Sequence, residues 1–296
     1  MEDKRQKPPI ISILDRRQGE DEQSEIRRIV IALGGNAILK ASQVGTIEEQ
    51  FANTEEACSQ IVRVIKEGHS VILTHGNGPQ VGNILRRVEI AAPEIYTLPL
   101  DVCVADSQGG MGFMLQEALN NEAIKADVDL QVATIITRCQ VEEDDPAFKN
   151  PVKPIGSFMT EEEAQLKKEK DGWDVVEDSG RGWRRVVPSP WPKKILERNL
   201  IKTLVENNYS VIACGGGGVP VCKGKDGLFF GVEAVIDKDV ASALLALEVK
   251  ADIYVILTGV EKVQINFGKP DAKSLDNVSI EEVKQYMEEG QFPPGS

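Results

Sequence analysis

Residues 29–37 read Ile29-Val30-Ile31-Ala32-Leu33-Gly34-Gly35-Asn36-Ala37, an apolar run that ends in a glycine pair. A continuous apolar run without alternation is typical of a strand buried on both faces, as in a parallel sheet. Glycine has no Cβ, so the backbone can turn sharply there and come close to a ligand. Open α/β folds bind ligands where parallel strands end, so the stretch predicts an α/β fold and a ligand-binding turn. An ordinary tight turn without a ligand would have the same sequence.

A helix and a second strand follow this turn. Residues 46–66 predict a helix, because Thr46 and Glu49 form a capping box and Gly68 follows its end. Residues 70–74 are a second apolar run, followed by a turn that contains Gly76 and Asn77 and by a helix to about residue 91. Strands that alternate with helices in this way indicate right-handed crossovers and a parallel sheet.

A glycine-rich stretch at residues 106–112 leaves two interpretations open. Residues 99–105 lead into this stretch, which contains Ser107, and we expect a helix from its end to about residue 121. Its glycines suit either the approach of a ligand or close packing against a neighbouring element. Residues 131–137 are rich in β-branched side chains and predict the next strand.

The pattern changes over residues 141–190, where prolines, charged residues and three tryptophans replace clean periodicity. A loop of this length without structure of its own is uncommon, so we expect an inserted lobe or lid. Lys153 is distinctive within it, because Pro151 and Pro154 stiffen the backbone on both sides. Such a backbone suits a lysine whose ammonium group is held in place.

The second half contains two candidate anion sites. After a helix expected over residues 192–207, a strand over residues 210–214 runs directly into four glycines at 215–218. Their backbone N–H groups can form a concave phosphate cradle, and a flexible linker is the alternative. Further on, Lys238 stands between Asp237 and Asp239 at the start of an apolar helix over residues 240–249. A helix N-terminus favours anions, and the aspartates can hold the ammonium group or cap the helix.

Composition narrows the class of protein. The net charge is −13, which argues against a nucleic-acid partner. The five cysteines are scattered and outside any Cys-x-x-Cys motif, so they resemble the reduced thiols of a cytoplasmic protein. With only two histidines, His69 and His75, we expect no metal site built by the protein, and His75 is interpreted as structural. No apolar run is long enough for a membrane span, and residues 1–25 are expected to be a mobile arm.

Several of these stretches together resemble the carbamate kinases of the amino-acid kinase family, in that family's order. They are residues 32–37, 74–82, 107–109, 150–156, 180–190, 215–220, 234–239 and 257–260. The resemblance implies an open three-layer αβα sandwich around a mainly parallel sheet, over residues 26–296, with the segment at 141–190 as a small protruding lobe. It also implies a cytoplasmic homodimer that transfers a phosphoryl group reversibly between carbamoyl phosphate and ADP, with Mg²⁺ bound to the nucleotide, to give ATP and carbamate.

The resemblance also implies roles for individual residues. The lysines that clamp the transferred phosphoryl group would be Lys153 and Lys238. The residues on the carbamate and phosphate side would be Gly34, Gly35, Asn36, Gly76, Asn77 and Ser107. The residues on the nucleotide side would be Gly216, Gly217, Asp237, Thr258 and Val260.

Elementary electrostatics fits these roles. Phosphoryl transfer requires alignment and neutralisation of charge more than covalent help. An ammonium group about 4 Å from an anion, at an effective dielectric constant of about 20, contributes about 4 kcal/mol. That corresponds to about three decades of rate if the interaction forms only in the transition state. The lysines are therefore expected to govern the rate, and the glycine turns the placement.

Two differences from the wider family bear on function. Other amino-acid kinases have a lysine two residues before the first glycine pair, where this chain has Ala32 as carbamate kinases do, and this favours carbamate as the acceptor. The family also continues beyond Gly295-Ser296 with a further lysine motif, so we expect a segment of the family's C-terminal part to be missing. A catalytically weakened nucleotide-binding homologue is therefore the alternative function.

Overall fold

The computed structural model describes residues 26–40, 43–178, 180–258 and 262–292, and of Asn36 and Ser157 it describes only the backbone. The chain forms two units, a large one that ends at Leu257 and a small one that begins at Thr258. The predicted mobile arm at residues 1–25 lies outside the described residues.

The large unit is built on a five-stranded sheet in the order β12-β1-β2-β9-β3, in which every neighbouring pair is parallel. Its strands are β1 (Arg28–Leu33), β2 (Ser70–His75), β3 (Gln131–Thr134), β9 (Tyr209–Ile212) and β12 (Ile253–Leu257). Leu33 of β1 is paired with His75 of β2 and with Leu257 of β12. The turns after β1 and β2 therefore open at the same edge of the sheet.

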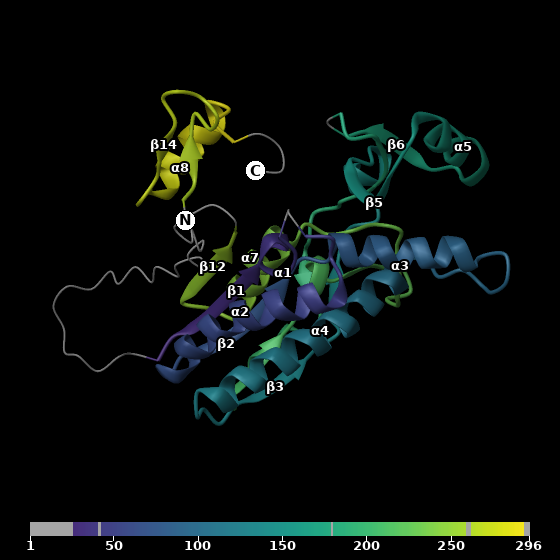
Figure 1. Cartoon of the computed structure of the whole chain (residues 1–296). Helices are drawn as coiled ribbons and strands as arrows, with labels where there is room; N and C mark the ends of the chain where they lie inside the picture. Colours follow the sequence, from purple (N-terminus) through teal and green to yellow (C-terminus); the bar gives the residue numbers. More distant parts are fainter. Residues whose placement is uncertain (1–25, 41–42, 179, 259–261, 293–296) are drawn as a thin grey trace, which may run out of the picture. The chain divides into compact units, whose positions relative to one another are not determined.

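Helices cover both faces of this sheet, as the sequence predicted (Figure 1). On one face, α2 (Ile47–Lys66) packs against α4 (Leu100–Lys125), which also contacts β3. On the other face, α6 (Arg198–Glu206) and α7 (Lys238–Glu248) share an apolar core with the central strands. The layers are thus helix, sheet and helix, and the predicted αβα sandwich is confirmed.

The glycine-rich stretch at residues 106–112 is helical, contrary to the expected start of a helix after it. Helix α4 runs without a break from Leu100 to Lys125. Each interior glycine costs a helix up to about 1 kcal/mol, but this helix buries a whole row of apolar side chains against the sheet and α2. One of the three glycines, Gly112, lies directly against Thr134 of β3, which supports the close-packing interpretation.

The helix expected over residues 192–207 is shorter than predicted. Its first part is strand β8 (Lys194–Ile195), which pairs with β4 (Arg138–Gln140), and α6 begins only at Arg198. Ile195 is fully buried next to Cys139 in this pairing, so tertiary contact overrides the helical pattern. Strands β10 (Val219–Lys223) and β11 (Phe229–Gly231) complete this second, mixed sheet.

The predicted lobe has a sheet of its own. Strands β5 (Lys153–Met159), β6 (Asp174–Glu177) and β7 (Trp183–Val187) form an antiparallel sheet in the order β5-β7-β6. Helix α5 (Glu161–Asp171) packs on this sheet (Figure 1). Helix α3 (Gly78–Ala91) contacts β5 and so joins the lobe to the turn after β2.

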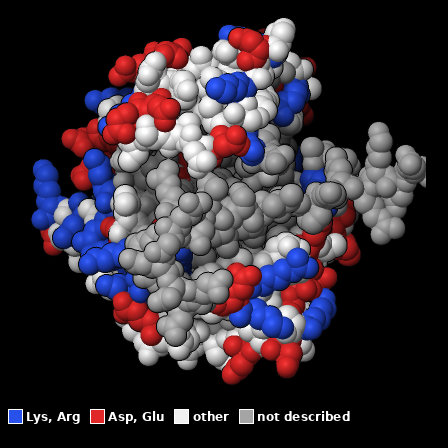
Figure 2. All heavy atoms as spheres, turned by 90° about the vertical axis from the view of Figure 1, so that its left-hand side faces the viewer, with Lys and Arg blue, Asp and Glu red and all other residues white. Residues whose placement is uncertain are grey.

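The small unit contains a short hairpin and a helix. The hairpin pairs β13 (Gln264–Ile265) with β14 (Lys273–Ser274), and helix α8 (Ile280–Glu288) follows. The capping box of Ser279 and Glu282 begins this helix. On the face in Figure 2, acidic and basic side chains of the described residues are interspersed. No helix in the described part of the chain is long and apolar enough to cross a membrane.

Candidate active site

The turns after β1 and β2 lie next to one another. After β1, Gly34 caps a short helix, α1 (Gly35–Ile38), and its backbone N–H donates to the carbonyl oxygen of Leu257 at 2.9 Å. After β2, the N–H of Gly76 donates to the carbonyl oxygen of Leu33 at 3.1 Å. These two hydrogen bonds continue the strand pairing past the ends of β1 and β2. Gly34 and Gly76, both predicted to bind substrate, therefore lie along one edge of the sheet.

Asn77 and Ser107 form a buried pair beneath this edge. The Nδ2 atom of Asn77 donates to Oγ of Ser107 at 2.8 Å, and that hydroxyl donates to the carbonyl oxygen of Val104 at 2.6 Å. Ser107 is a buried residue of α4, and its hydroxyl group contacts the turn after β2 through its hydrogen bond with Asn77. The structure thus brings together two of the predicted substrate residues.

The four glycines at 215–218 form a tight, buried turn rather than a flexible linker. A short 3-10 turn (Gly215–Gly217) begins after Cys214, and Gly216 and Gly217 have φ angles of +65° and +93°. A Cβ atom on Gly216 would overlap the side-chain amide of Asn77. A Cβ atom on Gly217 would stand 2.7 Å from the carbonyl oxygen of Ile236. Only glycine fits these positions, and the turn lies between Asn77 and the start of α7.

Both predicted lysines reach the start of α7. The Nζ atom of Lys153, at the beginning of β5, lies 2.9 Å from Oδ2 of Asp237, and both side chains are close to 40% exposed. Lys238 is the first residue of α7 and its Nζ atom lies 2.6 Å from Oδ1 of Asp239. A Cβ atom on Gly76 would stand 3.3 Å from Cδ of Lys238, so the stem of this lysine lies on the turn after β2. Both ammonium groups therefore lie at the N-terminus of α7, and the stem of Lys238 also contacts the turn after β2.

Asp237 caps α7 and remains ionised. Its Oδ1 atom accepts hydrogen bonds from the backbone N–H groups of Asp239 at 3.0 Å and Val240 at 3.4 Å. Burial raises the pKa of Asp237, but the hydrogen bond and charge of Lys153, together with these two N–H groups, outweigh burial and lower the pKa below its usual range. The side chain of Asp237 thus both caps α7 and binds the ammonium group of Lys153.

Comparison with known proteins identifies the family. The model of the amino acid kinase family matches residues 27–296. The carbamate kinase of Thermococcus kodakarensis is 51% identical over 275 residues, which are 92% of this chain and 87% of that protein. The carbamate kinase of Pyrococcus furiosus is 50% identical over 272 residues, 91% of this chain and 86% of that protein.

The chain belongs to the carbamate kinases of the amino acid kinase family. The solved structure of the carbamate kinase from Giardia lamblia bound to AMP-PNP agrees, with a TM-score of 0.85 and 43% identity over 92% of this chain and 86% of that one. Family membership and the αβα fold are thus established together.

Three residues that the carbamate kinase resemblance assigned to the site are not shown together with the others. The side chain of Asn36 and all of Val260 lie outside the described residues. Thr258 is exposed and begins the small unit. The roles of all the assigned residues stay predictions; those other than these three lie in the large unit, at the carboxyl edge of its sheet or around the start of α7.

Sequence reasoning missed a buried hydroxyl pair that connects β2 to α7. Thr74, the residue before His75, donates to Oγ of Ser242 at 2.6 Å, and Ser242 donates to the carbonyl oxygen of Lys238 at 2.5 Å. Both side chains are fully buried. A polar residue at the end of an apolar strand was the available signal, but its partner in a distant helix could not be read from the chain.

His75 is buried as the sequence interpretation required. Its Nδ1–H donates to the carbonyl oxygen of Gly76 at 3.0 Å, and a Cβ atom on Gly215 would stand 2.5 Å from its Nε2 atom. Burial lowers the pKa of His75 to about 4, and the hydrogen bond to Gly76 only partly opposes this. The imidazole of this carbamate kinase is therefore neutral near pH 7 and fills the space between the two glycine turns.

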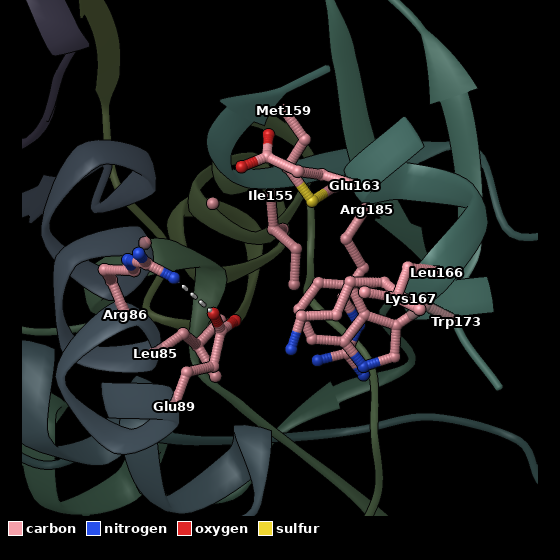
Figure 3. A pocket seen from close by; sticks show the side chains of 12 residues that line it. Leu85, Arg86, Glu89, Ile155, Met159, Glu163, Leu166, Lys167, Trp173 and Arg185 are labelled. Atoms are coloured by element: carbon pink, nitrogen blue, oxygen red, sulfur yellow. Dashed lines mark hydrogen bonds and ion pairs between the residues drawn. The ribbon is translucent and has the colours of Figure 1, made fainter. Parts of the chain in front are cut away.

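A cavity of about 130 Å³ lies between α3 and the lobe, and neither Lys153 nor Lys238 is among the residues that line it (Figure 3). Trp173 forms part of its wall, with Nζ of Lys167 at 4.7 Å and Cζ of Arg185 at 4.8 Å from the centre of its ring. These cations also pair with Asp171 and Glu233. The cavity is lined by Gly82, Leu85, Arg86, Glu89, Ile155, Gly156, Met159, Glu163, Leu166, Lys167, Trp173 and Arg185.

Proposed function

We propose that this carbamate kinase transfers a phosphoryl group reversibly between carbamoyl phosphate and MgADP, giving carbamate and MgATP. The observation that supports this most is the meeting of Lys153 and Lys238 at the start of α7, beside the turn of Gly76. Phosphoryl transfer requires that the charge on the transferred group be neutralised and that the attacking and leaving oxygens be aligned. Two ammonium groups beside glycine turns suit both requirements.

The proposed roles follow from position. The turns after β1 and β2 would bind the carbamate and phosphate groups, and the glycines at 215–218 would bind the nucleotide. Lys153 and Lys238 would exchange their aspartates for the oxygens of the transferred group. The pair of Lys153 and Asp237 is partly exposed to solvent, and such pairs contribute at most about 1 kcal/mol, so exchange is inexpensive.

Magnesium enters this proposal as part of the nucleotide substrate. Within the part of the chain that the structure describes, there is no cluster of three or more metal-binding side chains. Mg²⁺ is commonly bound by substrate phosphates together with one or two carboxylates, and Asp237 and Asp239 are the carboxylates beside the lysines. The nucleotide would therefore carry the metal into the site.

We also propose that the chain acts as a homodimer in the cytoplasm. The outer face of α4 exposes Val102, Phe113 and Ile124, with Gly109 and Gly110 between them. Exposed apolar side chains along one long helix are typical of an interface, and the glycines would let a second copy approach closely. Phe113→Glu should then give a monomer in light scattering, and a monomeric mass for the unaltered protein would contradict the proposal. The five buried, unpaired cysteines suit a reducing compartment.

The decisive experiment is a coupled assay of ATP formed from MgADP and carbamoyl phosphate, with calorimetric titration of MgADP alongside. We expect turnover well above the rate without enzyme, and ADP binding in the absence of carbamoyl phosphate. Binding without turnover in folded protein would support the alternative of a catalytically weakened nucleotide-binding homologue. Absence of both in folded protein would contradict both functions.

A further inference from the structure

We propose that Gln108 and Thr137 are positioning residues that hold the glycines at 215–218 in the conformation that binds the nucleotide. The proposal rests on the function proposed above and identifies the residues that keep the nucleotide side of the site rigid. Neither residue belongs to the site predicted from the sequence, and both are almost completely buried, at 2% and 0% exposure.

The side chain of Gln108 makes the hydrogen bonds to the backbone of Thr137 that a neighbouring strand would make in a sheet. Its Nε2 atom donates to the carbonyl oxygen of Thr137 at 3.0 Å, and its Oε1 atom accepts from the N–H of Thr137 at 2.7 Å. Both backbone groups of one residue, just beyond the end of β3, are therefore satisfied by a single amide side chain from α4. Buried backbone groups need such partners, so Gln108 determines where Thr137 lies.

Thr137 in turn holds both ends of the glycine turn. Its Oγ1 atom accepts from the N–H of Cys214 at 3.0 Å, immediately before the glycines. Its carbonyl oxygen accepts from the N–H of Val219 at 2.8 Å, immediately after them. The same hydroxyl donates to the carbonyl oxygen of Ile135 at 2.8 Å, which fixes its orientation.

Cys214 shows why the turn needs such support. It has a φ angle of +51°, a left-handed conformation that residues other than glycine adopt only at a cost in free energy. The surrounding structure must therefore enforce it, and the hydrogen bond from Cys214 to Thr137 acts at this residue. Without the bond, Cys214 would relax toward negative φ and the following N–H groups would turn away from a bound phosphate.

Two consecutive residues of α4 thus serve the two sides of the site. Ser107 supports Asn77 in the turn after β2, and Gln108 supports the glycines at 215–218 through Thr137. Because the two residues support different sides of the site, the loss of each support should weaken the binding of a different substrate. Loss of the support at Thr137 should affect the nucleotide, while the binding of carbamoyl phosphate should stay close to its original value.

The test is Thr137→Val in the full chain, with KM for MgADP, KM for carbamoyl phosphate and direct calorimetry of MgADP. Valine keeps the shape and removes the acceptor for Cys214. We expect the Kd and KM for MgADP to rise about tenfold, the usual scale for one buried hydrogen-bonding group left without its partner. The KM for carbamoyl phosphate should change less than about threefold on the same reasoning. Thr137→Ser, which keeps the hydroxyl, should restore nucleotide binding.

Thr54→Val is the matched control, because Thr54 is equally buried and its hydroxyl donates one hydrogen bond, to Gln50 within α2. It should lose stability and keep both KM values. If Thr137→Val binds MgADP like the unaltered protein, weakens both substrates equally, or is not rescued by serine, the proposal is wrong.

A second variant decides the matter if Thr137→Val does not fold. Gln108→Leu removes both hydrogen bonds to Thr137, and it should weaken MgADP binding selectively; unchanged MgADP binding would overturn the proposal. Calorimetry separates the two claims. Unaltered protein that binds MgADP without turnover contradicts the proposed reaction and leaves the inference testable, whereas a lack of MgADP binding contradicts both.

Discussion

Acidification from about pH 7 to about pH 5 should destabilise this protein by about 2 kcal/mol through His75 alone. The imidazole is 1% exposed between Gly76 and Gly215, and burial lowers its pKa from 6.5 to about 4. The unfolded chain therefore binds a proton between these two values that the folded chain does not bind. Because the folded pKa is depressed, the stabilisation is fully present above about pH 6.5 and is lost as the pH falls toward about 4.

The size of the effect follows from the two pKa values. The interval between 6.5 and about 4 corresponds to about 3 kcal/mol when the loss is complete, and about 2 kcal/mol of it is lost by about pH 5. Such a loss is a large fraction of the total stability of a typical protein, about 5–15 kcal/mol. Asp237 acts in a separate, more acidic range, since its pKa is lowered from 3.8.

The assay is urea unfolding at several pH values for the unaltered protein and for His75→Asn. The amide of asparagine can donate to Gly76 as Nδ1 does, but it does not titrate. The variant should therefore lose about 2 kcal/mol less than the unaltered protein between about pH 7 and about pH 5. His69→Asn controls for the loss of an imidazole elsewhere. Equal pH dependence of His75→Asn and the unaltered protein would refute the argument that His75 is buried in its neutral form.

Three further outcomes are expected from the same geometry. Lys153→Ala and Lys238→Ala should each lower kcat by about two to three decades with a smaller change in ADP affinity, and near-normal turnover would remove that lysine from the proposed chemistry. Gly216→Ala should weaken ADP binding in calorimetry, because its Cβ would overlap Asn77 and its φ is +65°; unchanged affinity would contradict the proposed cradle. Gly112→Ala should cost about 1–3 kcal/mol in urea unfolding, because its Cβ would overlap Cγ2 of Thr134, and Thr134→Ser should relieve most of this cost.

Local sequence signals were sufficient for much of the fold. The apolar runs that became β1 and β2 were buried as predicted, since strands covered on both faces need continuous apolar side chains. The capping box of Thr46 begins α2, and Asp237 caps α7 with Lys238 as its first residue. These features depend on neighbours within a few residues, so the chain itself carries the information.

The prediction was wrong where long-range packing outweighed local preference. A helix was expected to begin only after residues 106–112, yet α4 runs through these glycines because its buried face gains more than the glycines cost. Residues 192–197 read as helix, yet Ile195 pairs with Cys139 in a sheet. In both places the deciding partner is distant in the chain, and no local pattern reports it.

The sequence by itself determined the order of strands and helices, the family, and which lysines and glycines to examine, because these depend on residue type and spacing. Only the tertiary structure decided that Lys153 meets Asp237, that Gly216 lies against Asn77, and that Thr137 holds both ends of the glycine turn. Each of these contacts joins segments that are far apart in the chain. Their geometry is set by how the helices pack on the sheet, a property of the whole core that residue spacing does not encode.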